Sequence, residues 1–169
     1  MLLRHLLNLL GPALALACGP AAAQQQQLRN WFGDPFFSIT SAVPGCPEPA
    51  GPRVSAAERG EQSHRRAEKG TTCWLANEQD CQRHTAYAYD QDIASAIRHA
   101  IRSGDPFPRS SLWVTVQGRV VYVEGCATGA TDPAQIESFM RAVPHVQQAI
   151  AIIATDPTAP LPYRAFKTR

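Results

Sequence analysis

The segment from Ser111 to Gly125 constrains the fold more than any other part of the chain. Leu112, Val114 and Val116 alternate with other residues in the two-residue period of a β-strand that has one buried face. The same alternation resumes after Gly118, where the sequence Gln-Gly-Arg indicates a tight turn, and it ends at Gly125. The segment therefore predicts two antiparallel strands joined by a glycine turn, with Gly125 closing the second strand.

An amphipathic helix is expected before this strand pair. Ile93, Ile97 and Ile101 recur at four-residue spacing and form one apolar face. Asp90 is the expected N-cap, and Ser103-Gly104 is the expected end of the helix.

A second helix is expected after the strand pair. Asp132 suits its N-cap, Pro133 its first helical position, and Gln135 a reciprocal capping contact. Its apolar stripe is expected to bury four side chains, which are Ile136, Phe139, Met140 and Val143. Pro144 ends this pattern, and a third strand over Val146 and residues 150–153 follows.

The element order from residue 90 to residue 155 is thus helix, strand, strand, helix, strand. The second helix is long enough to be a crossover, so the third strand adds to the sheet after the hairpin. We expect an α+β domain in which two helices cover one face of a three-stranded mixed sheet. Trp113 and Tyr122 fall on the opposite face, which is either open or covered by residues 28–89.

Residues 1–23 have the pattern of a secretory signal peptide. A short basic start precedes an apolar run, and Ala21-Ala22-Ala23 offers a small-residue cleavage site. The alternative is a lipoprotein in which Cys18 is acylated. Both alternatives predict an exported, periplasmic protein.

Either alternative leaves an even set of four cysteines, Cys46, Cys73, Cys81 and Cys126. In an exported protein such a set predicts two disulfide bonds, and three pairings are open. If all four pair, one N-terminal cysteine bridges to Cys126. Cys73, Cys81 and His84 do not have the close spacing of a zinc site, so no metal is predicted.

The regions outside the αββαβ unit contain weaker signals. Residues 24–52 are polar, aromatic and proline-rich, and Trp31 and Phe32 lie in their aromatic cluster, which is expected to pack on the core. Residues 53–89 contain the cysteines and a capping box, Ser55 to Glu58, that predicts a surface helix ending at Gly70. The proline-rich residues 156–169 are expected to form an extended, mobile tail.

The αββαβ unit resembles the BON domain, a bacterial module named for osmotically induced and nodulation proteins. The resemblance covers residues 90–155 and rests on the isoleucine helix, the strand pair with Gly118 and Gly125, and the sequence Ala-Val-Pro-His-Val over 142–146. Two features depart from the family pattern. The hairpin is one residue longer between its glycines, and His145 stands where the family usually has glycine. The resemblance implies an envelope protein that binds phospholipid or mediates contacts in envelope complexes.

Neither charge nor motifs indicate an enzyme. The 16 Lys and Arg side chains nearly balance the 14 Asp and Glu, which gives no electrostatic footprint for nucleic acid. Catalytic motifs are missing and the histidines are scattered over different expected elements, so no cofactor is predicted.

Three hypotheses follow for the function. The first is a noncatalytic module that binds phospholipid or a membrane surface through Trp31, Phe32, Trp113 or Tyr122. The second is a protein-interaction module of an envelope complex, and the third is an uncharacterised hydrolase or metal-binding protein. Exposure of the four aromatic rings distinguishes the first hypothesis from the second, and the oligomeric state stays open.

Overall fold

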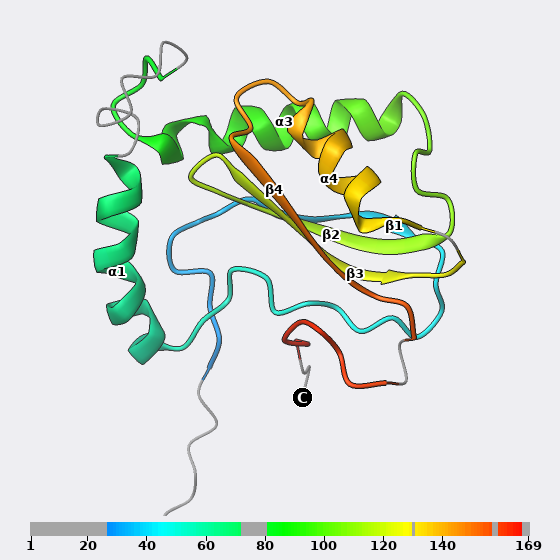
Figure 1. Cartoon of the computed structure of the whole chain (residues 1–169). Helices are drawn as coiled ribbons and strands as arrows, with labels where there is room; N and C mark the ends of the chain where they lie inside the picture. Colours follow the sequence, from blue (N-terminus) through cyan, green and yellow to red (C-terminus); the bar gives the residue numbers. More distant parts are fainter. Residues whose placement is uncertain (1–26, 72–80, 130, 157–158, 167–169) are drawn as a thin grey trace, which may run out of the picture.

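The computed structural model describes residues 27–71, 81–129, 131–156 and 159–166, and has the expected α+β class. The first half contains β1 (Phe36–Ser41), α1 (Ala56–Gly70) and, after a 3₁₀ turn, α3 (Asp90–Arg102). The second half contains β2 (Ser110–Gln117), β3 (Val120–Ala127), α4 (Pro133–Arg141) and β4 (Gln148–Ala154). The expected signal peptide, Cys18 and Cys73 lie outside the described residues. Figure 1 shows α3 and α4 together above the sheet, with α1 at one side.

The sheet has four strands in the order β1-β2-β3-β4, so the expectation of three strands is wrong. The additional strand is β1, which pairs antiparallel with β2 so that Phe36 lies opposite Thr115 and Phe37 opposite Val114. The remaining order is as expected, with an antiparallel β2–β3 hairpin and a parallel β3–β4 pair joined by α4. The sequence conceals β1 because its partner lies more than 70 residues away and a β-bulge interrupts its register between Ser38 and Thr40.

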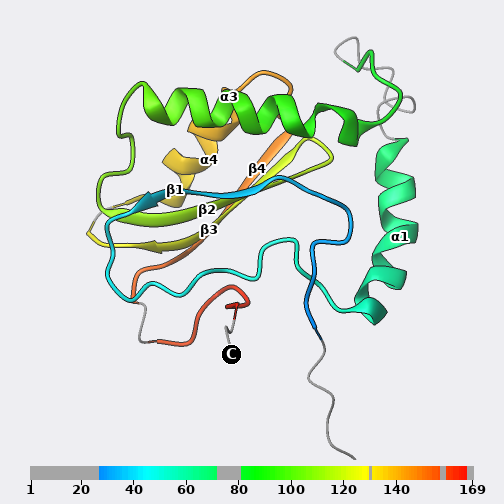
Figure 2. The same cartoon turned by 180° about the vertical axis from the view of Figure 1, so that it is seen from behind.

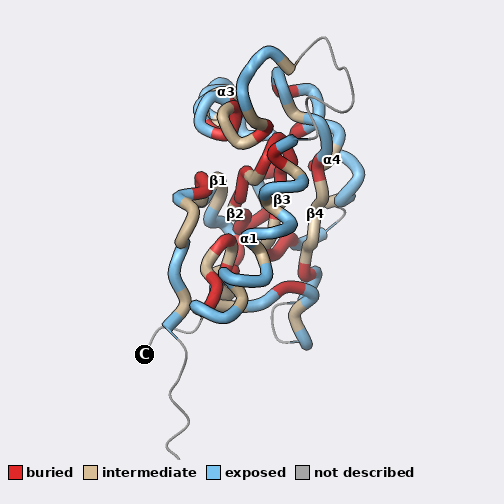
Figure 3. The backbone as a smooth tube through the Cα atoms, turned by 90° about the vertical axis from the view of Figure 1, so that its left-hand side faces the viewer, coloured by how far each residue is buried: buried red, intermediate tan, exposed pale blue. Residues whose placement is uncertain are grey.

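The main hydrophobic core lies between the sheet and the two helices α3 and α4. Val114 of β2 and Val123 of β3 are fully buried there, with Ile93 and Ile97 of α3 and Met140 of α4. This arrangement confirms that the two helices share one face of the sheet. Figure 3 shows buried residues along the strands beneath α3 and α4.

The β2–β3 turn is a two-residue turn that is held from outside the hairpin. Gly118 and Arg119 have φ values of 58° and 67°, which is the left-handed pair that a type I′ turn needs. The buried Asp90 carboxylate accepts hydrogen bonds from the amides of Gly118 and Arg119, at 2.7 and 2.9 Å. Asp90 is therefore the first residue of α3 rather than its N-cap, and Tyr89 occupies the cap position without a side-chain bond.

The other two helix starts follow the sequence. Ser55 and Glu58 form the predicted capping box at α1, and the Ser55 hydroxyl accepts from the Glu58 amide. Asp132 caps α4 by accepting from the Ala134 amide, and Pro133 occupies the first helical position. The bonds that cap α4 do not include the expected one to the Gln135 side chain. The backbone amide of Gln135 donates to the Asp132 carbonyl instead.

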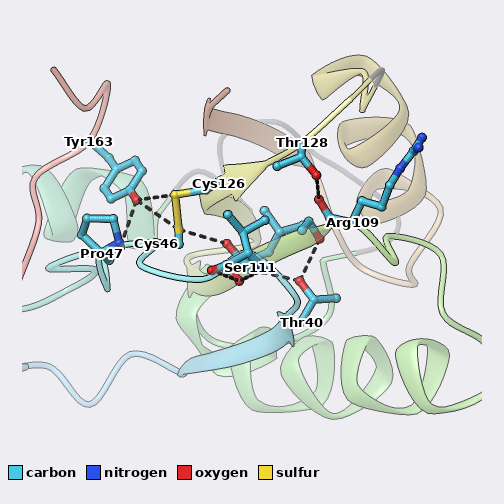
Figure 4. The surroundings of a disulfide bond; sticks show 11 residues. Thr40, Cys46, Pro47, Arg109, Ser111, Cys126, Thr128 and Tyr163 are labelled. Carbon is cyan, nitrogen blue, oxygen red and sulfur yellow. Dashed lines mark hydrogen bonds between the residues drawn. A yellow bond between two sulfur atoms is a disulfide. The ribbon is translucent and has the colours of Figure 1, made fainter. Parts of the chain in front are cut away.

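Residues 43–54, here called the strap, cross the opposite face of the sheet, away from α3 and α4 (Figure 2). A disulfide bond between Cys46 and Cys126 ties the strap to the end of β3, across 80 residues of sequence. The bond lies in a second, smaller core with Val43, Ala154 and Tyr163 (Figure 4). Cys81 is disulfide-bonded as well.

Residues 159–166, here called the tail, pack against the strap, which contradicts the expectation of a mobile tail. The Ala50 amide donates to the Arg164 carbonyl at 2.6 Å, and the Phe166 amide donates to the Glu48 carbonyl at 2.7 Å. Tyr163 is buried, and its hydroxyl donates to the Pro47 carbonyl at 2.9 Å. The tail is extended, but these bonds hold it in place.

Candidate functional site

The face of the sheet opposite α3 and α4 contains the most distinctive side chains of the fold, and we call it the second face. Strand register places Trp113, Glu124 and Ile152 in one row across β2, β3 and β4. The next row contains Thr115, Tyr122 and Ile150, with Phe36 of β1 at its end. Thr115 is buried and the other members of both rows are half-buried, so solvent reaches part of this face.

The strap and tail close the second face at its edges. At the β3 end the second core covers Cys126 and Ala154. At the β1 side Gly51 lies so close to Phe36 that an added Cβ would be 2.4 Å from the Phe36 ring. The Arg53 guanidinium stacks on the same ring, 4.8 Å from its centre. Within the two rows Thr115 is the one buried member, so the covering reaches the middle of the face.

The Thr115 hydroxyl, in the second of these rows, is buried without a hydrogen-bond partner in the described part of the chain, and Thr115 is only 5% exposed. Burial raises the pKa of the Glu124 carboxyl, and the nearby Arg164 guanidinium offsets this only in part. Burial likewise raises the pKa of Tyr122.

Phe32 is engaged by a buried ion pair rather than free to bind a partner. The Arg66 guanidinium binds both carboxylate oxygens of Asp34, at 2.7 and 2.9 Å, and stacks 4.0 Å from the Phe32 ring centre. The Gln117 side chain donates to the same Asp34 carboxylate at 2.8 Å. This network joins α1 to the hairpin and therefore gives Phe32 a structural role.

Trp31 also packs within the fold. Its indole N–H donates to the Val54 carbonyl at 2.8 Å, and Arg29 and Arg59 stack on its ring. It lines a groove of about 360 Å³ beside Ala57 at the start of α1. The expectation that this aromatic cluster packs on folded elements agrees with these contacts.

The outer edge of β4 is a second surface with unusual properties. Ala151 donates its amide away from β3, to Glu137 of α4 at 3.1 Å. Because backbone groups alternate sides along a strand, Ala149 and Ile153 direct their amides and carbonyls to the same outer side. No partner for those groups is found in the described residues. Figure 3 shows β4 at the margin of the sheet with mostly intermediate burial.

The four aromatic candidates thus divide into two pairs. Trp113 and Tyr122 lie on adjacent rows of the second face, whereas Trp31 and Phe32 belong to the α1 packing. Alternation in the sequence already places Glu124 and Thr115 beside the first pair. The burial of the Thr115 hydroxyl without a partner depends on long-range packing, which the sequence does not reveal.

The remaining predicted residues have structural roles. Gly125 has a φ of 148°, and an added Cβ would be 2.1 Å from the Ser111 carbonyl oxygen, so only glycine fits there. Gly118 forms the hairpin turn, and Asp132 and Pro133 start α4. Within the described residues no three His, Cys, Asp or Glu side chains converge as metal ligands.

Comparisons with known proteins add no assignment. No protein-family model, curated protein or solved structure matches the chain. In the described part of the chain, no helix combines the length and apolar character needed to cross a bilayer.

Proposed function

We propose that this chain is a noncatalytic, exported binding protein of the bacterial cell envelope, with a BON-like αββαβ unit that binds an extended segment of a protein partner along the edge of β4. The signal-like residues 1–23 and the disulfide-bonded cysteines support export. The edge of β4 supports the mode of binding. The engagement of Trp31 and Phe32 within the fold favours a protein partner over a membrane anchor.

The outer edge of β4 lacks the features that usually protect a strand edge, and this observation carries the proposal. Exposed strand edges in soluble proteins are usually blunted by charges, proline or a bulge, because free backbone groups recruit other strands. β1, the opposite edge, is bulged. β4 has the sequence QAIAIIA, without charge or proline, and its pairing with β3 is regular throughout. Among the described residues, Glu137 hydrogen-bonds to its outer side, at the Ala151 amide.

An incoming strand would extend the sheet by the same backbone bonds that join β3 to β4. On the second face its side chains would adjoin Ile150 and Ile152, which are half-buried. The partner is therefore an extended segment with apolar residues at alternate positions. It would displace Glu137 from Ala151.

Site-specific photocrosslinking in the envelope tests this proposal. A crosslinking residue at Gln148, exposed on β4, is compared with one at Ser95, exposed on α3. A partner specific to position 148 is expected to be lost with Ala151→Pro, which removes the outward amide but no bond to β3. Its yield is expected to rise with Glu137→Ala, which frees that amide. Equal crosslinks at both positions, or a yield unchanged by both variants, would overturn the proposal.

Phospholipid binding is the second candidate, since Trp113 and Tyr122 remain partly accessible on the second face. Amphipathic rings of this kind favour the headgroup region of a bilayer. Cosedimentation of the oxidised protein with anionic and zwitterionic vesicles tests it, with Trp113→Ala and Trp31→Ala as the variants. Binding lost with Trp113→Ala supports this candidate, and absence of binding at low salt excludes it for the unacylated protein.

A further inference from the structure

We propose that the partner of the β4 edge is β4 of a second copy of this chain, so that two sheets join into one about a two-fold axis at Ala151. This inference rests on the proposed function, because it names the occupant of the same edge. It begins from β4 itself, whose sequence QAIAIIA is an extended apolar segment of the kind that the edge requires of an incoming strand.

The backbone groups of β4 select one register for this pairing. Ala149, Ala151 and Ile153 direct their amides and carbonyls outward, since the Ala151 amide donates to Glu137 rather than to β3. In an antiparallel pair, two opposite residues with facing backbone groups exchange both of their hydrogen bonds. A two-fold axis at Ala151 places Ala149 opposite the partner's Ile153 and Ala151 opposite the partner's Ala151. This register pairs all three outward residues, whereas a shift of the axis by one residue leaves one of them without a partner inside β4.

The side chains of β4 are complementary to themselves in the same register. On the second face Ile150 lies opposite the partner's Ile152, and both residues are half-buried in the single chain. On the helix side the small Ala149 lies opposite the larger Ile153 of the partner subunit. Apolar pairs directly across two strands stabilise a sheet, and the sequence of β4 brings no charge into this pairing.

The two edges of the sheet differ in a way that favours a closed pair of chains. β1 is bulged between Ser38 and Thr40, and a bulge opposes the addition of a further strand. β4 is regular and pairs with β3 over its whole length. A two-fold pairing uses the regular edge of each chain and leaves only the bulged edges outside, so association ends at two copies. The near balance of 16 Lys and Arg against 14 Asp and Glu leaves little net repulsion between the copies.

Glu137 limits this self-association. In the single chain its carboxylate accepts from the Ala151 amide at 3.1 Å, at the position of the proposed axis. It also forms an ion pair with Arg141 at 3.3 Å. Ala151 can bond to the second copy only after Glu137 has left it, and both chains of the pair lose this bond. The contact therefore favours the single chain and keeps the pairing reversible.

Sedimentation velocity of the oxidised protein, purified after export, tests the pairing over a range of protein concentrations. We expect an equilibrium between monomer and dimer without larger species. Glu137→Ala is expected to tighten the dimer at least about tenfold, because a hydrogen bond to a charged group no longer has to be broken in each chain. Glu61→Ala, on the exposed surface of α1, is the matched control and is expected to leave the dimer affinity unchanged. Ala151→Pro is expected to weaken the dimer at least about tenfold, because it removes the outward amide at the axis.

Two measurements on chains with an unaltered edge test the register. Amide hydrogen exchange of Ala149 and Ile153 in the wild-type protein is expected to slow as the concentration rises and the dimer forms. The photocrosslinking residue at Gln148 is expected to join two copies near Ala154, which the register places opposite it.

The outcomes separate this inference from the proposed function. A wild-type protein that stays monomeric up to millimolar concentration, or a Glu137→Ala variant without a tighter dimer, would overturn the second copy as the partner. A crosslink from position 148 to a different protein, with no product of two copies, would overturn it as well and leave the proposed function standing. Equal crosslinks from positions 148 and 95 would overturn both.

Discussion

Removal of the Cys46–Cys126 disulfide is expected to cost several kcal/mol of stability. The bond closes a loop of 80 residues, and the chain-entropy relation gives about 4.5 kcal/mol at 25 °C for a loop of that length. Cys126 is fully buried, so alanine is the appropriate replacement at both positions because it introduces no polar group. The double variant is therefore expected to unfold with a free energy about 4 kcal/mol lower than the wild-type protein.

Chemical denaturation of the oxidised proteins measures this loss. The m value is expected to rise in the double variant, since the unfolded chain without the crosslink exposes more surface. Tyr163→Phe is the matched control, because it keeps the crosslink but removes the hydroxyl that donates to the Pro47 carbonyl. That single bond is expected to contribute about 1 kcal/mol. A loss below about 1.5 kcal/mol in the double variant, with an unchanged m value, would refute the entropic argument.

Three further substitutions test other parts of the structure. Asp90→Ala is expected to cost about 3 kcal/mol in denaturant unfolding, because it leaves two amides of the hairpin turn without their acceptor. Gly125→Ala is expected to cost at least about 2 kcal/mol because its Cβ would overlap the Ser111 carbonyl, whereas Gly104→Ala meets no neighbour and is the control. Glu124→Gln is expected to change the pH dependence of Tm. Burial raises the folded-state pKa of Glu124 above its ordinary value of 4.5, so wild-type stability falls as pH rises through that folded-state pKa. The variant should therefore gain Tm relative to wild type as pH rises above about 4.5, and no relative gain would contradict the sign of this shift.

The elements that the sequence predicts well are those with local signals. The hairpin follows from strict alternation around Gly118, and α3 and α4 follow from apolar stripes that the sheet then buries. Each of these signals spans fewer than twenty residues, because the alternation or the apolar stripe lies within the element that it predicts. Such elements need no knowledge of what packs against them from elsewhere in the chain.

The elements that the sequence misses depend on distant partners. β1 becomes a strand because the segment with Phe36 and Phe37 pairs with the edge of β2. The tail is held because its backbone groups form hydrogen bonds with backbone groups of the strap. Asp90 shows a subtler limit. An aspartate before a helical stripe is a typical N-cap, but the amides that its carboxylate satisfies belong to a turn 28 residues later.

His145 illustrates how packing holds a side chain in an unfavourable backbone conformation. It has a φ of 68°, the left-handed conformation that glycine adopts most readily. Its ring lies 5.0 Å from the Tyr89 ring, and its carbonyl accepts from the Arg119 side chain at 2.9 Å. These contacts offset the strain that a side chain introduces there.

The candidate site follows the same division between local and distant causes. Alternation alone places Trp113, Tyr122 and Glu124 on one face, so the sequence is sufficient to bring the chemical groups together. Whether that face is a filled core or a binding surface depends on the strap, which the Cys46–Cys126 bond fixes at the far end of β3. The bond holds the strap at Cys126, while Gly51 and Arg53 of the same strap contact Phe36 at the other side of the face. Oxidation therefore does more than stabilise the fold, because it fixes where the strap lies on the second face.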